Sequence, residues 1–414
     1  MDSMGMNFIE ALDDEMTSLF GGLSGGYFHD PWMPSPISLE TVTGIALRFA
    51  VEGKLTSAEE IETGHINSTW KVGFETEDGQ ERQYILQRIN ATVFENPMAV
   101  MKNVERVTRH INARVMRTKK DQSGQTLALY PGRDGKFWVS DEGDGVWRCY
   151  NFIEGCRTYN VVENERQAYQ AARAFGAFQD LVSDLSSELL VETIPGFHDT
   201  RARYDRLMKA VEADACGRLA EVEEELAFIR ECEGDVDRVL GLLARGEMPQ
   251  RITHNDTKIN NVMINEESDE AVCVIDLDTV MPGSVLYDFG DMVRSAVSPA
   301  AEDETDLSKV MVRMPIFEAL VDGYLSSAGG FLNEVEVANL AFSAKLITLE
   351  VGMRFLTDHL EGDRYFKIHH AGHNLERCRT QLRLVKCLEE KMGEMEAVVR
   401  ASFAKVGATG GFDA

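Results

Sequence analysis

The sequence predicts an α+β protein with two lobes, a small N-terminal lobe built on an antiparallel sheet and a larger, mainly helical C-terminal lobe. Two observations lead to this prediction. Strand-like runs separated by turn residues fill much of the chain before Gly155. After Gly155 the chain becomes rich in Ala, Leu, Glu and Arg, which favour helices. We expect a flexible extension over residues 1–35, the first lobe over 36–153 and the second over 154–405.

The first element expected is a helix that begins after Ser38. Serine is a good N-cap, and the residues that follow place Val42, Ile45, Ala46 and Phe49 at helical spacing. We therefore expect one amphipathic helix ahead of the sheet.

Two hairpin patterns follow. The run WKVGFETEDGQERQYILQRI, residues 70–89, has strand-like segments on either side of the turn signal Asp78-Gly79. The run LALYPGRDGKFWVSDEGDGVWRCYNFIEG, residues 127–155, repeats the pattern around Asp134-Gly135. Four or five antiparallel strands are expected.

A helix is predicted between the two hairpins. Residues 96–116 place Val100, Val104, Val107 and Ile111 at helical intervals, with polar residues between them. The first lobe should therefore be a sheet with one inserted helix.

Composition excludes several classes of protein. A formal net charge of −27 over 414 residues argues against nucleic-acid binding, which needs clustered Lys and Arg. Seven cysteines without a C-x-x-C pair suit a reducing compartment and give no metal signature. We find no secretory leader pattern and no apolar run of about 18 residues. A cytoplasmic protein with no membrane or nucleic-acid partner is expected.

The chemistry is concentrated in residues 251–291. Two short apolar runs, residues 262–264 and 271–275, flank an acidic turn and predict a β-hairpin. Pairing about this turn would put Asn261 opposite Asp276. One amide oxygen and one carboxylate oxygen at the mouth of a hairpin suit Mg²⁺, which prefers few protein ligands beside substrate phosphates.

Asp256 and Lys258 precede this hairpin. A carboxylate at position 256 could accept the proton of an attacking hydroxyl, and Lys258 could neutralise charge on the transferred phosphoryl group. A single Asx residue here could simply cap a turn. The four residues in this order favour a phosphoryl-transfer site instead.

The order His254-x-Asp256-x-Lys258-x-x-Asn261, followed by Asp276, resembles the catalytic loop and metal-binding Asp of protein kinases. The continuation IDLDTVMPGSVLYDFGD looks more like aminoglycoside phosphotransferases. Within that superfamily, THNDTKINNVMI and DLDTVMPGSVLYDFGDMVRS are most similar to N-acetylhexosamine 1-kinases. The segments GHINSTWKV, YILQRIN, FIEG, PGFHDT and MRFLTDHLEGDRYFK extend the resemblance, in order, over about residues 36 to 400.

This resemblance implies a bilobal, protein-kinase-like fold and an ATP- and Mg²⁺-dependent sugar kinase. It would phosphorylate the anomeric 1-hydroxyl of an N-acetylhexosamine, with Asp256 and Lys258 in catalysis and Asn261 and Asp276 as metal ligands. The partners implied are ATP and a small-molecule sugar, in a monomer or homodimer.

On the nucleotide side the resemblance implies a set of residues from the sheet, the inserted helix and the joint between lobes: Ser68, Thr69, Gln87, Arg88, Glu105, Phe152 and Ile153. Ser68 and Thr69 belong to a turn that covers the phosphates. Gln87 stands where protein kinases place a strand lysine, and whether Gln87 or Arg88 contacts phosphate stays open. Glu105 would orient such a basic residue, and the two residues at the joint would pack beside adenine.

On the acceptor side the helical lobe offers donors and acceptors suited to a polyol with an acetamido group, namely Arg354, Asp358, Arg364 and Tyr365. The resemblance favours Arg354 and Tyr365. His65 and the pair His198-Asp199 could also face the sugar. The three histidines His369, His370 and His373 lack a partner at a zinc-site spacing, so we do not expect a metal there.

Other interpretations stay open. The same loop could act on homoserine, choline or an aminoglycoside, because it contacts only a hydroxyl and phosphates. Because the strand lysine is absent, a catalytically silent nucleotide-binding module is a further alternative. A protein kinase is disfavoured, since no A-P-E triplet follows Asp276.

Overall fold

The structure, a computed structural model, describes residues 37–61, 66–117, 126–143 and 145–409. The predicted extension over residues 1–35 lies outside the described residues, and so does His65. From Ser38 onward the chain forms one compact unit. In the described ranges, no helix is both long and apolar enough to cross a membrane.

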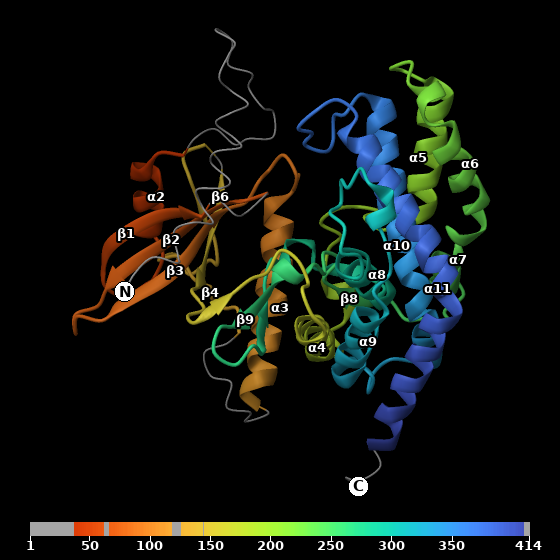
Figure 1. The fold of residues 1–414 in the computed structure, drawn as a ribbon. Helices are drawn as coiled ribbons and strands as arrows, with labels where there is room; N and C mark the ends of the chain where they lie inside the picture. Colours follow the sequence, from red (N-terminus) through yellow and green to blue (C-terminus); the bar gives the residue numbers. More distant parts are fainter. Residues whose placement is uncertain (1–36, 62–65, 118–125, 144, 410–414) are drawn as a thin grey trace, which may run out of the picture. The chain divides into compact units, whose positions relative to one another are not determined.

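An antiparallel sheet dominates the first half of this unit (Figure 1). In the described part of the chain it has six strands in the order β1-β2-β3-β6-β4, with β5 paired to β6. The strands are β1 Lys54–Ile61, β2 Ser68–Glu75, β3 Glu81–Arg88, β4 Leu129–Tyr130, β5 Val139–Ser140 and β6 Val146–Asn151. The predicted hairpin about Asp78-Gly79 is confirmed by the β2–β3 pairing, in which Glu75 faces Glu81.

Helix α2, Leu39–Ala46, precedes the sheet and begins where the sequence predicts. The Ser38 side chain accepts a hydrogen bond from the N–H of Thr41 at 3.1 Å. The prediction that Phe49 belongs to this helix is wrong. Phe49 lies beyond the helix end, where it forms a β-bridge with Gly132 and is fully buried.

The inserted helix α3, Pro97–Arg117, follows β3 in the chain and packs against segments of the helical part of the unit. Its predicted apolar positions, Val100, Val104 and Val107, are fully buried. The Asn103 side chain donates to main-chain oxygens on two distant segments, at 2.7 and 3.0 Å. Helix α3 is therefore fixed by specific polar contacts as well as by its apolar face.

The second half is mainly helical, as predicted, and the α+β class is confirmed. Its helices are α4 Glu165–Val182, α5 Thr200–Ala213, α6 Glu223–Glu231, α7 Arg238–Ala244, α8 Val285–Ala296, α9 Met314–Ala328, α10 Glu334–Glu361 and α11 His373–Thr409. Short 3-10 turns connect several of them: η1 Ser187–Leu189, η2 Leu219–Glu221, η3 Glu233–Asp235, η4 Ile259–Asn261, η5 Leu277–Thr279 and η6 Leu307–Lys309.

Two small antiparallel sheets interrupt these helices. One has the order β10-β9-β7 and the other pairs β11 with β8. Their strands are β7 Cys156–Arg157, β8 Arg251–Thr253, β9 Val262–Asn265, β10 Ala271–Val274 and β11 Met281–Gly283. The predicted hairpin over residues 262–275 is therefore present as β9 and β10.

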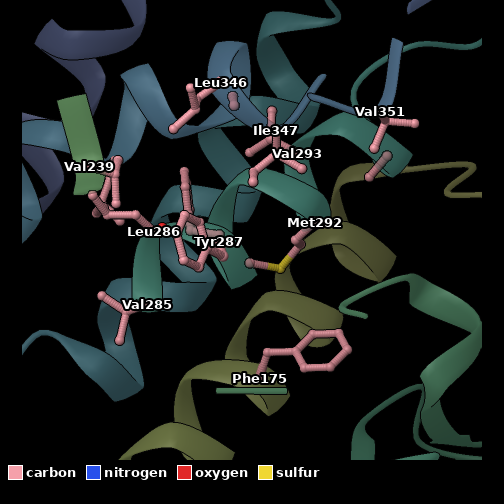
Figure 2. Close-up of a cluster of buried hydrophobic side chains, with 14 of the residues drawn as sticks. Phe175, Val239, Val285, Leu286, Tyr287, Met292, Val293, Leu346, Ile347 and Val351 are labelled. Carbon is pink, nitrogen blue, oxygen red and sulfur yellow. The ribbon is translucent and has the colours of Figure 1, made fainter. Parts of the chain in front are cut away.

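The core of the helical part lies where α4, α8 and α10 meet. Figure 2 shows Phe175 of α4, Met292 and Val293 of α8, and Ile347 of α10 among these buried side chains. Helices α8 and α10 approach closely at Gly290, where an added Cβ would lie 2.5 Å from the carbonyl oxygen of Ser343. This packing places the start of α8 against residues 251–261, which contain the predicted catalytic residues.

Candidate active site

The loop between β8 and β9 carries the predicted catalytic residues. Because β8 pairs with β11 and β9 pairs with β10, the loop is fixed at both ends. The N–H of Ile275 donates to the carbonyl of Asn261 at 2.9 Å. Asn261 was expected directly opposite Asp276, but the hairpin centres on Ser268, so its direct partner is Ile275. Asp276 is the next residue after Ile275 at the hairpin mouth.

Asp256 contacts two other polar residues of the loop, Lys258 and Asn261, through its carboxylate. The Nζ of Lys258 lies 3.0 Å from Oδ1 of Asp256. The Nδ2 of Asn261 donates to Oδ2 of Asp256 at 3.0 Å and to its main-chain oxygen at 2.8 Å. The Asp256 side chain keeps 27% of its exposure. The structure thus brings the three residues together and leaves the carboxylate within reach of a substrate.

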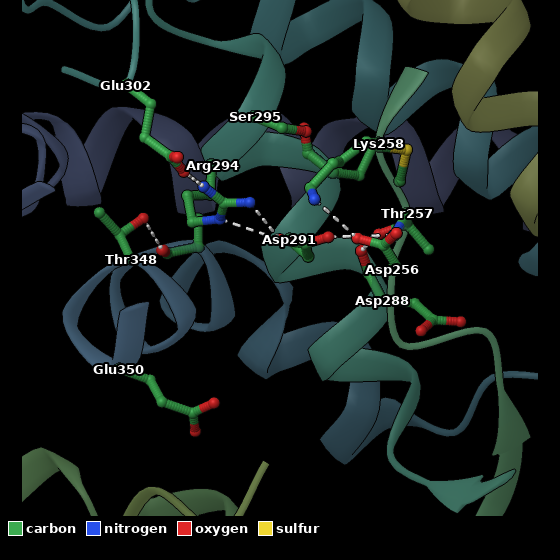
Figure 3. A network of polar contacts seen from close by, with 12 residues as sticks. Asp256, Thr257, Lys258, Asp288, Asp291, Arg294, Ser295, Glu302, Thr348 and Glu350 are labelled. Atoms are coloured by element: carbon green, nitrogen blue, oxygen red, sulfur yellow. Dashed lines mark hydrogen bonds and ion pairs between the residues drawn. The ribbon is translucent and has the colours of Figure 1, made fainter. Parts of the chain in front are cut away.

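Helix α8 holds this loop through two aspartates (Figure 3). The fully buried Asp288 accepts from the N–H of His254 at 2.9 Å and from the N–H of Asn255 at 2.7 Å. Asp291 accepts from the N–H of Thr257 at 3.0 Å. Asn255 has a φ of 64°, a left-handed conformation that costs about 1–2 kcal/mol for a residue with a Cβ. The aspartates therefore stabilise a strained loop.

Arg294 supports this arrangement, and the sequence prediction did not include it. Its Nε lies 2.9 Å from Oδ1 of Asp291, and its Nη1 lies 3.0 Å from Oε1 of Glu302. The Arg294 and Asp291 side chains are both nearly inaccessible. Their spacing of three residues on one helix face was the available signal, because such pairs are neighbours on a helix.

The surroundings of Asp256 favour its ionised form. Burial alone would raise its pKa, but the charge of Lys258, the electrostatic effect of His254 and the hydrogen bonds from Lys258 and Asn261 outweigh burial and lower the pKa. The Asp256 charge in turn raises the pKa of Lys258. At neutral pH the site therefore holds a carboxylate beside an ammonium group.

Asp276 is in the opposite situation. Desolvation by the surrounding protein and the charges of Asp278 and Asp256 raise its pKa to about 7, while Arg148 and Lys258 oppose the rise. Its side chain still has access to solvent, and its backbone is left-handed with φ 60°. Several carboxylates therefore crowd one region that has too few cations to balance them.

These donors fit a hard divalent cation. Asp276 supplies an accessible carboxylate, and Asn261 uses its amide nitrogen on Asp256, which leaves the amide oxygen as its ligand atom. Mg²⁺ prefers such oxygens, and a cation would neutralise the excess negative charge. Within the described ranges, no group of three or more His, Cys, Asp or Glu side chains could hold a metal. An ion at Asn261 and Asp276 would take waters and substrate phosphates as its further ligands.

The histidine cluster has other partners. His373 lies 3.0 Å from Asp303, and His370 lies 2.7 Å from Glu376. The Nδ1 of His373 also accepts from the N–H of His369 at 3.2 Å, so both ring nitrogens of His373 have partners.

On the nucleotide side, Thr69 and Gln87 lie together in the sheet. The Nε2 of Gln87 donates to Oγ1 of Thr69 at 3.0 Å, and its Oε1 accepts from Nε of Arg148 at 3.0 Å. Arg148 forms an ion pair with Asp278, two residues after Asp276. Sequence reasoning missed Arg148 and Asp278, because the 130 residues between them leave no local pattern.

Arg88 and Glu105 have partners other than each other. The Nε of Arg88 lies 3.1 Å from Oδ2 of Asp141. Glu105 pairs with Arg109 one turn along its own helix, also at 3.1 Å. Ser68 faces Arg88 across the β2–β3 ladder. Glu105 therefore does not orient Arg88, the basic strand residue, as the sequence predicts.

Phe152 and Ile153 directly follow β6, at the predicted joint between the sheet and the helical part. Ile153 is buried, with 6% exposure, and Phe152 is half-buried. The N–H of Phe152 donates to the carbonyl of Gln83 at 3.3 Å. Their packing beside adenine stays a prediction.

A pocket on the helical part contains both residues favoured for the acceptor. It is lined by Arg203, Arg206, Arg354, Thr357, Asp358, Glu361, Tyr365 and Phe366. The Nη2 of Arg354 lies 3.5 Å from the hydroxyl of Tyr365, and its guanidinium lies 5.5 Å from the ring centres of Phe197 and Phe366. Arg206 is paired with Glu361.

Asp358, Asp199 and His198 have structural partners. Asp358 accepts from the N–H groups of three consecutive residues, 364–366, at 2.7 to 2.9 Å, and so orders the segment that presents Tyr365. Asp199 is the N-cap of α5. The buried His198 lies 2.8 Å from Glu350.

A family model described as the phosphotransferase enzyme family, APH, matches residues 57–311. Among solved structures, an aminoglycoside phosphotransferase from Alicyclobacillus acidocaldarius subsp. acidocaldarius DSM 446 is 11% identical, with a TM-score of 0.56 over 91% of this chain and 99% of that one. An amicoumacin kinase in complex with AMP-PNP, Ca2+ and Ami is 12% identical, with a TM-score of 0.51 over 86% and 94% of the two chains. A microcompartment-associated aminopropanol kinase is 16% identical, with a TM-score of 0.50 over 87% and 99%. At these identities the similarity shows the fold, which is the expected bilobal, kinase-like one.

Proposed function

The chain belongs to the APH phosphotransferase enzyme family, and from this premise we propose that it is an ATP- and Mg²⁺-dependent kinase for the anomeric 1-hydroxyl of an N-acetylhexosamine, GlcNAc or GalNAc. The product would be the sugar 1-phosphate and ADP. The observation that carries the proposal is the ionised Asp256, held by Lys258 and Asn261, whose charge raises the pKa of a second carboxyl, Asp276.

In the proposed reaction the 1-hydroxyl oxygen forms a bond to the γ-phosphorus of ATP, and the bond from that phosphorus to the β,γ-bridging oxygen breaks. Asp256 accepts the hydroxyl proton, and Lys258 offsets negative charge on the transferred group. Asn261 and Asp276 would hold Mg²⁺, which neutralises phosphate charge when bound. An anomeric hydroxyl is more acidic than an ordinary alcohol, so a base of low pKa suffices.

In the proposed function the pocket around Arg354 binds the acceptor, and its lining favours a neutral or anionic acceptor over a cationic one. Three arginines line it, and its two acids have other tasks, since Glu361 pairs with Arg206 and Asp358 binds main-chain N–H groups. Choline or an aminoglycoside would need an acidic pocket to balance its charge. Arg354 and Tyr365 could instead hydrogen-bond sugar hydroxyls and the acetamido oxygen.

Two alternatives remain, with the same family membership. The enzyme could phosphorylate a different neutral or zwitterionic alcohol such as homoserine. It could also be a silent nucleotide-binding module, because Gln87 replaces the strand lysine. The ionised Asp256 in a supported loop argues for an active enzyme, since a silent module has no use for a base.

The test is a phosphoryl-transfer assay with ATP and Mg²⁺ against GlcNAc, GalNAc, glucose, galactose, homoserine, choline and kanamycin, with phosphorus NMR of each product. The methyl glycoside of GlcNAc, whose 1-hydroxyl is blocked, is the matched control. We expect a sugar 1-phosphate from GlcNAc or GalNAc and no product from the glycoside. Phosphorylation of the glycoside would contradict transfer to the anomeric position.

A further inference from the structure

Arg148 is a buried cation that links the large sheet to the segment after Asp276. It lies on β6 and is 1% exposed. Its Nη1 pairs with Oδ1 of Asp278, while its Nε and Nη2 donate to Oε1 of Gln87 at 3.0 and 2.9 Å. The guanidinium thus connects β3 and β6 with turn η5, which begins directly after Asp276.

Asp278 is also held from a second point near the sheet. Its Oδ2 accepts from Nδ2 of Asn67, just before β2, at 2.6 Å. Asn67 is fixed in turn, because its Oδ1 accepts from the N–H of Asn90 at 3.0 Å. The main-chain oxygen of Asp278 accepts from the hydroxyl of Thr193 at 3.2 Å. Both carboxylate oxygens are therefore engaged by side chains from different, distant segments.

Stability alone is a weak reason to bury this pair. Two charges lose most of their hydration on burial, and well-packed apolar residues of similar size are often as stable or more so. What the ion pair and the Asn67 hydrogen bond add is a defined position for Asp278. Asp276 lies only two residues away, with a left-handed backbone, so the position of Asp278 limits where the Asp276 carboxylate can lie.

We propose that Arg148 and Asn67 are positioning residues for the Mg²⁺–nucleotide complex: they hold Asp278 and thereby place the Asp276 carboxylate. In this chain the arrangement takes the place of a strand lysine, because the β3 position is occupied by Gln87, which serves as a hydrogen-bond partner of Arg148. The inference rests on the proposed function insofar as Asp276 is a metal ligand.

Two variants test it. Asn67→Ala removes, at a half-buried position, the hydrogen bond to Asp278 and the one accepted from the N–H of Asn90. Arg148→Lys keeps the charge but cannot bridge Asp278 and Gln87 as a planar guanidinium does. We expect each to weaken Mg²⁺–ATP binding about tenfold, measured as a Kd by calorimetry, because a charge-assisted hydrogen bond is lost. The Mg²⁺ concentration for half-maximal ATP binding should rise, while the KM for the acceptor changes less than about twofold.

Lys345→Met is the matched control. Lys345 makes a partly buried ion pair with Asp235 and Glu389, at 2.6 and 2.7 Å, on the helical part of the unit. Its loss should lower the melting temperature and leave the Kd for Mg²⁺–ATP unchanged. The comparison with this control separates an effect of lower protein stability from an effect of a displaced Asp276 carboxylate.

The proposal is wrong if Asn67→Ala and Arg148→Lys lower only the melting temperature, as the control does, and bind Mg²⁺–ATP as the wild type does. Should Arg148→Lys fail to fold, Asn67→Ala decides alone. The outcome is separable from the kinase function: weakened Mg²⁺–ATP binding supports the positioning role even when no acceptor is phosphorylated. A wild-type chain that does not bind Mg²⁺–ATP would contradict both proposals.

Discussion

At the scale of single residues, the two key carboxylates have different electrostatic surroundings. Lys258 and His254 lower the pKa of Asp256 against the effect of burial, whereas desolvation and nearby acids raise the pKa of Asp276. A general base must be ionised to accept a proton, which a lowered pKa favours. A carboxylate with a raised pKa is instead stabilised when it binds a cation. The roles assigned from the sequence, base for Asp256 and metal ligand for Asp276, stay predictions.

A buried pair in the helical part gives a prediction of pH dependence. Burial would raise the pKa of Glu350, but His198, Thr200 and Arg354 outweigh it and lower the pKa. A carboxyl whose pKa is lowered by folding stabilises the protein above its ordinary value of about 4.3 and loses this contribution as pH falls through the folded pKa. Glu350→Gln should thus cost about 3 kcal/mol of unfolding free energy at neutral pH.

The difference between wild type and Glu350→Gln should shrink below pH about 4.3, where the wild-type advantage is lost. Urea unfolding, followed by tryptophan fluorescence at a series of pH values, measures the free energy of unfolding of both proteins. A difference that stays constant over the whole range would show that Glu350 does not ionise as described.

The carboxylate of Asp288 gives a second prediction. It accepts from two main-chain N–H groups of the catalytic loop and from Gln179 at 2.6 Å, so Asp288→Asn would turn an NH2 group toward at least one donor. We expect a loss of about 2 kcal/mol in unfolding free energy and a lower kcat, because the strained loop loses its support. Denaturant unfolding and steady-state kinetics check it, and unchanged kcat would mean that the loop keeps its shape without Asp288.

Some of the site was predictable from single residues and some was not. Asp256, Lys258 and Asn261 are close in the sequence, so their spacing alone predicts that they meet. Arg148 and Asp278 meet only through the fold, because a strand of the sheet and a turn of the helical part lie 130 residues apart in the chain. A single sequence carries no local pattern for such a contact.

At the scale of elements, the position of α8 determines the shape of the catalytic loop. The helix can approach α10 closely because Gly290 has no side chain, and a Cβ there would lie 2.5 Å from the carbonyl oxygen of Ser343. Any shift of α8 would move Asp288 and Asp291 away from the loop N–H groups that they bind.

Gly290→Ala should therefore destabilise the protein by about 1–3 kcal/mol through overpacking, and should also reduce kcat. Gly44→Ala is the control, because Gly44 lies in helix α2 and a Cβ added there would meet no atom within 4 Å. That substitution should stabilise the protein by about 0.4–1 kcal/mol. Thermal unfolding of both variants measures the difference, and equal effects would contradict the close approach of α8 and α10.

Elements with strong local signals were predictable, and paired short strands were not. Ser38, as an N-cap, predicts the start of α2, and the helical spacing of the apolar residues from Val100 to Val107 predicts α3. Phe49 was assigned to a helix because helical spacing alone does not reveal a β-bridge to Gly132. The pairing of β8 with β11 was also missed, since three-residue strands carry almost no pattern and depend on tertiary contacts.

At the scale of the whole unit, the candidate site lies where segments of the sheet meet segments of the helical part. Arg148, Asn67 and Asn103 all cross from the first half of the chain to main-chain or side-chain atoms near Asp278 and Val280. The α+β arrangement was predictable because the sequence pattern changes from strand-like to helix-like at Gly155. The way in which the two parts contact each other was not, because it depends on these few long-range polar contacts.

The most direct test of the central claim is the turnover of Asp256→Asn in the phosphoryl-transfer assay, with the Kd for Mg²⁺–ATP measured on the same protein. The substitution removes the base and keeps the shape of the side chain. The account predicts a kcat at least about a hundredfold lower with nucleotide binding nearly intact. Turnover comparable to the wild type would remove Asp256 from the mechanism and contradict the account.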